Sequence, residues 1–131
     1  IRGYFDGDGS IYINKDKIPS MASVTISMPE SNGLQLCNFL REDVGIKVGF
    51  YSDNRIYKHS FGYMFCSDIE SKYLFIKYIY KNVESGKSNL FLERKFELAK
   101  DFINSVNENK TKRSKGKRCG STFNSFIENA I

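Results

Sequence analysis

The spacing of hydrophobic and polar positions changes several times along this 131-residue chain. Residues 1–7 have helical spacing. Residues 10–16 and 21–28 alternate between apolar and polar side chains, which is the period of a half-buried strand. From 29 to 45 the apolar residues again recur every three or four positions, and Gly45 is a candidate C-cap. The first third of the chain therefore predicts a helix, two strands and a second helix.

The same succession of patterns returns in the second half of the chain. It predicts two strands within 47–66 joined by a turn at Asp53–Asn54, a helix over 67–82 with Ser67 or Asp68 as its N-cap, and a helix over Leu90–Ser105. The order α-ββ-α-ββ-α-α indicates an α+β fold. We expect one four-stranded antiparallel sheet with the helices packed on one face.

Charge divides the chain into two parts. The stretch 110–118, KTKRSKGKR, holds six basic residues and no acid, which leaves 14 of the 20 basic residues against 15 acidic ones elsewhere. We therefore expect one domain over 1–107, large enough for its own core, and a basic C-terminal tail with a short helix over 108–131. Clustered Lys and Arg release counterions when they bind nucleic acid, although a merely solvated tail has the same composition.

Cysteine usage and hydropathy limit where the protein acts. Its three cysteines (Cys37, Cys66 and Cys119) are far apart and odd in number, which argues against a zinc site or a disulfide framework. This usage fits a reducing, intracellular setting. No apolar run approaches 18 residues, so we expect no membrane partner.

Polar side chains fill the second face of the predicted sheet. They are hydroxyls, amides, cations and aromatics, which can bond to phosphates and base edges. A solvated sheet face is also polar, so alternation alone does not establish DNA binding. The candidate DNA-binding residues are Ser10, Tyr12, Asn14, Ser23, Thr25, Ser27, Ser52, Asn54, Arg55, Tyr57 and Lys58 on the sheet, with Lys112, Arg113 and Lys115 in the tail.

The opening stretch, IRGYFDGDGSI, breaks a local rule. Asp6 and Asp8 lie at the C-terminal end of the first predicted helix, where the helix dipole is negative and carboxylates are unfavourable. Gly3 and Gly7 are four residues apart, so they share a helix face that a second helix can approach closely. Two such helices side by side would bring their acids together, and a divalent cation would make that tolerable. Gly9 is expected to end the helix with a positive φ.

Two other interpretations of this stretch compete with the paired helix. An EF-hand loop that starts at Asp6 needs glycine at its sixth position and glutamate at its twelfth, but Ile11 and Lys17 stand there. A turn rich in Asp and Gly is the plainer alternative, and the residues alone leave it open.

The first nine residues resemble the motif that names the LAGLIDADG homing endonucleases. The matching positions are Ile1 for Leu, Gly3 for Gly, Asp6 for Asp, Gly7 for Ala, Asp8 for Asp and Gly9 for Gly. The predicted element order is also similar to the αββαββα core of that family, over roughly residues 1–107. The resemblance implies a DNA endonuclease that hydrolyses phosphodiester bonds with Mg²⁺.

Residue roles follow from this resemblance. It implies that Asp8 and the backbone carbonyl of Gly7 bind Mg²⁺, that Asp6 supports the end of the helix, and that Gly3 and Gly7 form the pairing face. Outside the motif, Glu30 matches a family residue that orders water in the active site. Lys87 matches a lysine near the scissile phosphate, and Lys81 is the second candidate for that lysine. Leu34 and Gln35 stand where the family often has a basic residue.

One motif is present, whereas two are needed to cut both strands. The expected assembly is a homodimer on a pseudo-palindromic duplex site, or a pairing with a second motif-bearing domain in an intron- or intein-associated enzyme. The alternative is a non-cleaving DNA-binding protein on the same scaffold, such as a transcription regulator or an intron maturase. A third possibility is an α+β interaction module unrelated to nucleic acid.

Overall fold

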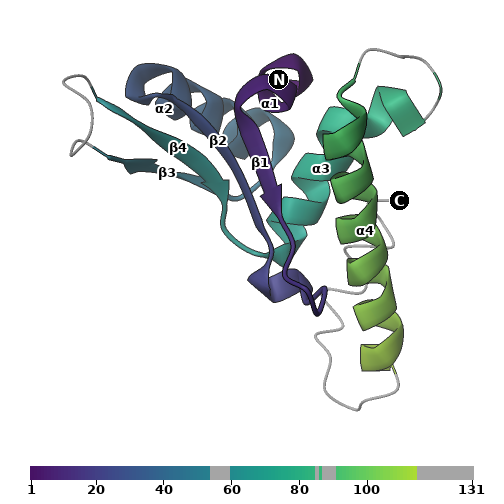
Figure 1. Cartoon of the computed structure of the whole chain (residues 1–131). Coiled ribbons are helices and arrows are strands. Elements are labelled where there is room, and N and C mark those ends of the chain that lie inside the picture. The colour runs from purple at the N-terminus through teal and green to yellow at the C-terminus, as the bar shows by residue number, and fades with distance from the viewer. Residues whose placement is uncertain (54–59, 85, 87–90, 115–131) are drawn as a thin grey trace.

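The helices and strands follow the order that the hydrophobic pattern predicts (Figure 1). The structure is a computed structural model that describes residues 1–53, 60–84, 86 and 91–114. Its elements are α1 (Arg2–Asp8), β1 (Gly9–Tyr12), a 3-10 turn η1 (Pro19–Met21), β2 (Ser23–Pro29), α2 (Glu30–Phe39), a π-helical turn η2 (Leu40–Val44), β3 (Val48–Ser52), β4 (Phe61–Cys66), α3 (Ile69–Glu84) and α4 (Glu93–Ser114).

The four strands form one antiparallel sheet in the order β1-β2-β4-β3. The register pairs Ile11 with Val24, and Ile26 with Met64, so the apolar positions of neighbouring strands fall on the same face. The β2–β4 pairing joins the two hairpins, which come from separate parts of the chain. This arrangement confirms the predicted α+β class and the four-stranded antiparallel sheet.

The hydrophobic core lies between this sheet and the helices. Val24, Ile26 and Met64 are buried on the inner face, where they belong to one cluster with Leu40 after α2 and Phe102 of α4. The helices cover this face, with α2 over β2, β4 and β3 (Figure 1). The described helices leave uncovered the opposite face, which carries Ser23, Thr25 and Ser27 on β2, as the alternation predicts.

The ends of three helices can be compared with their predicted signals. Asp68 is the N-cap of α3, since its Oδ1 accepts the Ser71 N–H at 2.7 Å. Gly45 ends η2 in the left-handed region (φ 83°), as expected of a C-cap glycine. Helix α4 is longer than predicted and continues past residue 107 to Ser114. Neither Gly nor Pro occurs in the chain between its predicted end and Gly116, so no residue there breaks the helix.

Both hairpins differ from their predicted limits. β1 ends at Tyr12, whereas we predicted a strand to residue 16, because Asn14 bonds within the turn: its Oδ1 accepts the Ile18 N–H at 2.8 Å. The predicted turn at Asp53–Asn54 falls partly outside the described residues, which stop at Asp53 and resume at residue 60; β3 ends at Ser52 and β4 begins at Phe61. The Asp53 N–H donates to the Phe61 carbonyl at 2.7 Å, which closes a longer connection.

None of the helices in the described ranges is both long enough and apolar enough to cross a bilayer.

Candidate functional site

Asp6 ties the end of α1 to two distant helices. Its Oδ1 accepts the Tyr80 hydroxyl of α3 at 3.0 Å, and its Oδ2 accepts the Leu92 N–H, just before α4, at 3.1 Å. Burial raises the pKa of Tyr80, and the neighbouring Asp6 charge and their hydrogen bond raise it further. These contacts are structural ones, of the kind that the resemblance implies for Asp6.

A buried lysine from α4 compensates the negative end of α1. The Lys95 ammonium donates to the carbonyls of Phe5 at 2.8 Å and Asp6 at 2.7 Å, where the helix dipole favours a cation. Burial lowers the pKa of Lys95, the carboxylates of Asp6 and Asp8 oppose that shift, and Arg94 adds to it. The unfavourable field that the sequence places on the two acids is thus offset from a position about 90 residues away.

Sequence reasoning missed Lys95, although a signal for it exists. In α4 the positions of Lys95, Ala99, Phe102 and Val106 are spaced by four, three and four residues, and all four side chains are buried. A lysine in phase with an apolar helix stripe must find acceptors inside the protein. The pattern could therefore have predicted a buried cation, but not which carbonyls it meets.

Asp8 has surroundings quite different from those of Asp6. It is the last residue of α1, it is exposed, and it makes no hydrogen bond or ion pair with any residue that the structure describes. The adjacent Gly7 is also exposed. Asp8 and the Gly7 carbonyl are oxygen ligands of the kind Mg²⁺ takes, and Mg²⁺ commonly binds through one or two carboxylates together with waters and substrate phosphates. They fit part of a magnesium site; in the described ranges no three His, Cys, Asp or Glu residues cluster to complete one.

The face of α1 that carries Gly3 and Gly7 is bare. A Cβ built on either glycine would meet no heavy atom within 4 Å, apart from its own helix backbone and chain neighbours, and both residues are exposed. Ile1 and Tyr4 on the same helix keep 40% and 43% of their surface exposed. Small and apolar residues therefore stand uncovered on a helix that is otherwise anchored in the core through Phe5.

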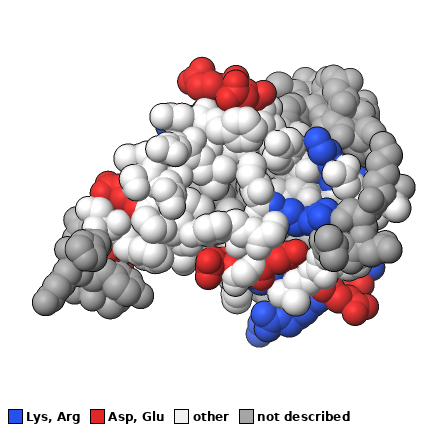
Figure 2. Space-filling view, turned by 90° about the horizontal axis from the view of Figure 1, so that it is seen from above, with Lys and Arg blue, Asp and Glu red and all other residues white. Residues whose placement is uncertain are grey.

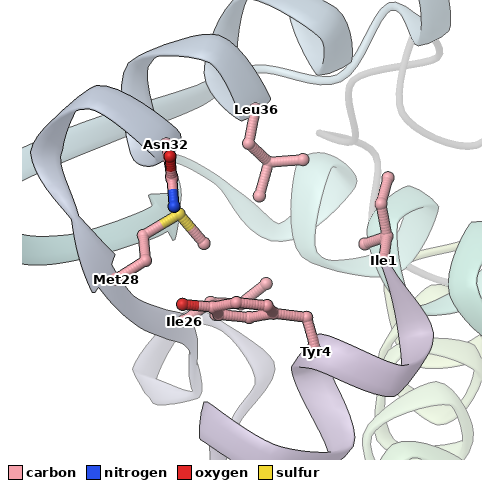
Figure 3. A pocket seen from close by; sticks show the side chains of 6 residues that line it. All are labelled: Ile1, Tyr4, Ile26, Met28, Asn32 and Leu36. Atoms are coloured by element: carbon pink, nitrogen blue, oxygen red, sulfur yellow. The ribbon is translucent and has the colours of Figure 1, made fainter.

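An apolar pocket lies next to this face. It measures about 260 Å³ and lies between α1, β2 and α2; its lining residues are Ile1, Tyr4, Ile26, Met28, Asn32 and Leu36. Figure 3 shows these side chains converging on one space, with the Tyr4 ring beside Ile26 and Leu36 above it. The exposed side of α1 and the pocket could together receive apolar side chains from another helix.

Gly9 ends α1 for a reason other than the predicted one. Its backbone is extended (φ −82°, ψ 160°), so the expected positive φ is wrong. A Cβ at this position would clash with the ring and the carbonyl of Phe5. Glycine is needed here because the chain passes so close to Phe5 as it turns from the helix into β1.

The open face of the sheet carries most of the expected polar residues. The register places Ser10 opposite Thr25, and Tyr12 opposite Ser23, so these side chains share one face with Ser27. Aromatic residues that we did not predict there lie on β3 and β4: Tyr51 and Tyr63 stack with their centroids 5.2 Å apart. A groove of about 540 Å³ runs over this face; among its lining residues are Ser23, Thr25, Ser27, Tyr51, Tyr63, Phe65 and Lys72.

Two predicted DNA-binding residues lie elsewhere. Ser52 pairs with Gly62, in phase with the inward-facing Phe50 and Met64, so it belongs to the helix-covered face. Its hydroxyl donates to Glu30 Oε1 at 2.8 Å. Our assignment of Ser52 to the open face is wrong by one strand position, because the outward residue is Tyr51. Asn14 is not on the sheet at all, since it lies in the turn after β1.

The remaining candidates divide into two groups. Glu30 is the first residue of α2, half-buried, with one carboxylate oxygen held by Ser52. Lys81 is exposed on α3, and its ammonium lies 4.9 Å from the centroid of the Tyr78 ring. Outside the described residues lie Lys87, Asn54, Arg55, Tyr57, Lys58 and Lys115, as do the side chains of Lys112 and Arg113.

Charged residues are unevenly distributed on the surface that Figure 2 shows, which is the upper side of the molecule as drawn in Figure 1. Figure 2 shows uncharged residues over much of its middle, with Lys and Arg gathered mostly in one half and Asp and Glu in separate patches. Depletion of charge is typical of the centre of a protein–protein contact.

Comparisons of the chain with models of protein families, with curated proteins and with solved structures found no match.

Proposed function

We propose that this chain is a site-specific, Mg²⁺-dependent DNA endonuclease of the LAGLIDADG type, with two motif helices paired through α1. The observation that carries the proposal is the contrast between Asp6 and Asp8. Asp6 bonds to two elements of the fold, whereas Asp8 stands exposed at the same disfavoured helix end without a bond to the described residues. A carboxylate kept in such a position without a structural contact suits a metal ligand.

The bare face of α1 supports the pairing. Gly3 and Gly7 leave room for a second helix backbone, and Ile1 and Tyr4 offer apolar surface beside an apolar pocket. Pairing two copies about a two-fold axis along this face would bring both Asp8 carboxylates to one place. Each would then contribute ligands that a single chain lacks.

Each candidate site residue has a distinct task in this proposal. Asp8 and the Gly7 carbonyl would hold Mg²⁺. When bound, the ion activates water for attack on a phosphodiester and stabilises the leaving oxygen. Glu30 has its Oε1 fixed by Ser52, so its second oxygen can accept a hydrogen bond from an ordered water. Lys87 is the candidate cation near the scissile phosphate.

The open sheet face would hold the duplex. Ser, Thr and Tyr hydroxyls bond both to phosphates and to base edges, and those of Ser10, Tyr12, Ser23, Thr25 and Ser27 share this face. A two-fold dimer presents two such faces and therefore fits a pseudo-palindromic site. The basic segment that starts at Lys110 would add contacts to phosphates without sequence preference.

Cleavage of a plasmid library in Mg²⁺ tests the activity. The parent chain should give linear product from a subset of plasmids, and Asp8→Asn should give none. Asp16→Asn is the matched control, since Asp16 is likewise an exposed aspartate but lies in the β1–β2 turn rather than in α1. It should cut like the parent. Specific band shifts without cutting, in either Mg²⁺ or Mn²⁺, would instead establish the non-cleaving DNA-binding protein.

Sedimentation tests the pairing separately from cleavage. The parent should sediment as a dimer when bound to its DNA, and Gly3→Leu should bind as a monomer with weaker affinity. Since a Cβ at Gly3 meets nothing within 4 Å, the thermal stability of the single chain should not fall with this substitution. A chain that stays monomeric at micromolar concentration, with and without DNA, contradicts the homodimer.

A further inference from the structure

The groove on the open sheet face contains a second buried lysine. Lys72 is the fourth residue of α3, only 8% of its surface is exposed, and it lines the groove together with Ser23, Thr25 and Cys66. Most of the Lys72 side chain is therefore packed in the protein, and the exposed remainder borders the groove. Sequence analysis did not single it out.

The two buried lysines of the described chain differ in their partners. The Lys95 ammonium donates to two carbonyls at 2.8 and 2.7 Å. The Lys72 ammonium makes no hydrogen bond or ion pair with any described residue. The ammonium itself is not fully buried, so it reaches solvent in the groove, but the burial of the rest of the side chain and the positive dipole of the first helix turn make its charge costly.

The groups around Lys72 reduce this cost only in part. Burial lowers the pKa of Lys72, and Cys66 and Asp68 oppose that shift. Burial raises the pKa of Cys66 to about 12, so this thiol is neutral at ordinary pH. Asp68 is occupied as the N-cap of α3, since its Oδ1 accepts the Ser71 N–H. The ammonium is therefore available to an anion that enters the groove from outside the chain.

We propose that Lys72, with the hydroxyls of Ser23 and Thr25, forms a phosphate-binding site in this groove. An ammonium and two hydroxyls supply donors for phosphate oxygens, and a cation at this position disfavours a metal ion. The same groove is lined by the stacked rings of Tyr51 and Tyr63, which suit the sugars or bases of a strand that passes over them. This site deepens the proposed function. It rests on that function for the source of the phosphate, which is the backbone of the bound nucleic acid.

Three variants test the site against matched controls. Lys72→Gln removes the charge, Lys72→Arg keeps it, and Lys100→Gln removes a charge from the exposed side of α4, where Lys100 pairs with Glu97 at 2.7 Å. The first measurement is the melting temperature in inorganic phosphate compared with chloride at equal ionic strength. Phosphate should raise the melting temperature of the parent, Lys72→Arg and Lys100→Gln, but not that of Lys72→Gln.

The second measurement is binding to a duplex, and to a single strand of the same sequence, at several salt concentrations. Lys72→Gln should weaken binding roughly tenfold and make the slope of log affinity against log salt shallower by about 0.9 on a duplex or about 0.7 on a single strand. Lys72→Arg should restore both. The nucleic acid for which the slope changes is the source of the phosphate.

The outcomes separate this site from the proposed endonuclease. Equal phosphate stabilisation of the parent and Lys72→Gln, together with equal salt slopes, would overturn the site whether or not the protein cuts DNA. Phosphate stabilisation that depends on Lys72, in a protein that binds no DNA, would retain the site and overturn the proposed function. Lys72→Gln should melt no lower than the parent in chloride, because it removes a charge that is costly at this position and has no partner among the described residues.

Discussion

Replacing Asp6 by asparagine should affect the stability of the fold differently from replacing Asp8 by asparagine. Asp6→Asn replaces one acceptor by an NH₂ group, which would face either the Tyr80 hydroxyl or the Leu92 N–H. We expect it to lower the free energy of unfolding by about 1–3 kcal/mol, the usual cost of removing a partner at a charged acceptor. Asp8→Asn should change it by less than about 1 kcal/mol, because relief from the negative end of α1 is opposed by the lost attraction to the Lys95 ammonium.

Urea denaturation of both variants beside the parent measures this difference. Equal losses would mean that Asp8 also holds the fold together, which would remove the main support for its role as a metal ligand. A stable Asp8→Asn variant also makes the cleavage test decisive, since loss of cutting then cannot come from unfolding.

Tyr80 gives the stability a dependence on alkaline pH. Its pKa is raised in the folded protein by burial and by Asp6, so above about pH 10 the unfolded chain loses the phenol proton first. The folded state then binds more protons than the unfolded one, and stability falls as the pH rises. The contribution of Tyr80 is therefore complete below about pH 10 and is lost above it.

Tyr80→Phe should show this directly. At pH 8 it should be less stable than the parent by about 1 kcal/mol, because the bond to Asp6 is gone. Between pH 10 and 11 that gap should narrow by roughly 1 kcal/mol, since the variant has no phenol at this position to titrate. Tyr12→Phe is the control: Tyr12 is 58% exposed, so its stability profile should run parallel to that of the parent. A gap that stays constant with pH would contradict the prediction.

Among the elements, α1 combines two glycine positions with opposite tolerance. Gly3→Ala adds a Cβ in open space on a helix, where alanine is favoured by about 0.4–1 kcal/mol, so the single chain should become more stable. Gly9→Ala places a Cβ against the ring and carbonyl of Phe5 and should cost roughly 1–3 kcal/mol. Thermal unfolding at low protein concentration compares the two. If Gly9→Ala were tolerated like Gly3→Ala, the close approach to Phe5 would not be what requires glycine at that position.

The order of the elements was predictable because each has a strong local signal. The alternation at 21–28 and the Asp68 N-cap both hold in the structure. The predictions that were wrong depended on side-chain hydrogen bonds and strand pairing, which the spacing of apolar residues does not show. Asn14 ends β1 through a side-chain bond across the turn, and the outward position of β3 depends on its pairing with β4, which moved Ser52 to the inner face.

The candidate site shows the same division. The motif itself indicated that the two acids of α1 were anomalous, and Asp6 and Asp8 do differ. The surroundings of the two buried lysines could not be predicted, because only the tertiary fold brings α4 to the end of α1, and α3 to the groove. Neither a strand register nor a contact between distant segments of the chain has a counterpart in local spacing.

At the scale of the whole molecule, the folded domain and the basic segment can be separated. Among the residues of α4 whose burial is described, the buried apolar ones are Ala99, Phe102, Ile103 and Val106. Truncation after Ser114 removes three basic residues, and truncation after Asn109 removes six. Both truncated chains should melt within a few degrees of the parent, because both keep every core side chain that the structure describes.

DNA binding should respond to the same truncations in steps. Removing one phosphate contact makes the slope of log affinity against log salt shallower by about 0.9, so the longer truncation should have the larger effect. Fluorescence anisotropy over a range of salt concentrations measures it. A salt slope that is the same in all three chains would show that the basic segment takes no part in binding.

Helix α1 is only seven residues long and has no side chain capping its first turn. Isolated helices of this length are not stable in water, so α1 depends on what holds its far end: Phe5 in the core, Asp6 on α3 and the segment before α4, and Lys95 on the last carbonyls. Its amide protons should consequently exchange with solvent faster than those of α3 in the free chain. A partner bound to the face of α1 that carries Gly3 and Gly7 would slow that exchange. The exchange rate of the α1 amides would therefore measure assembly independently of DNA cleavage.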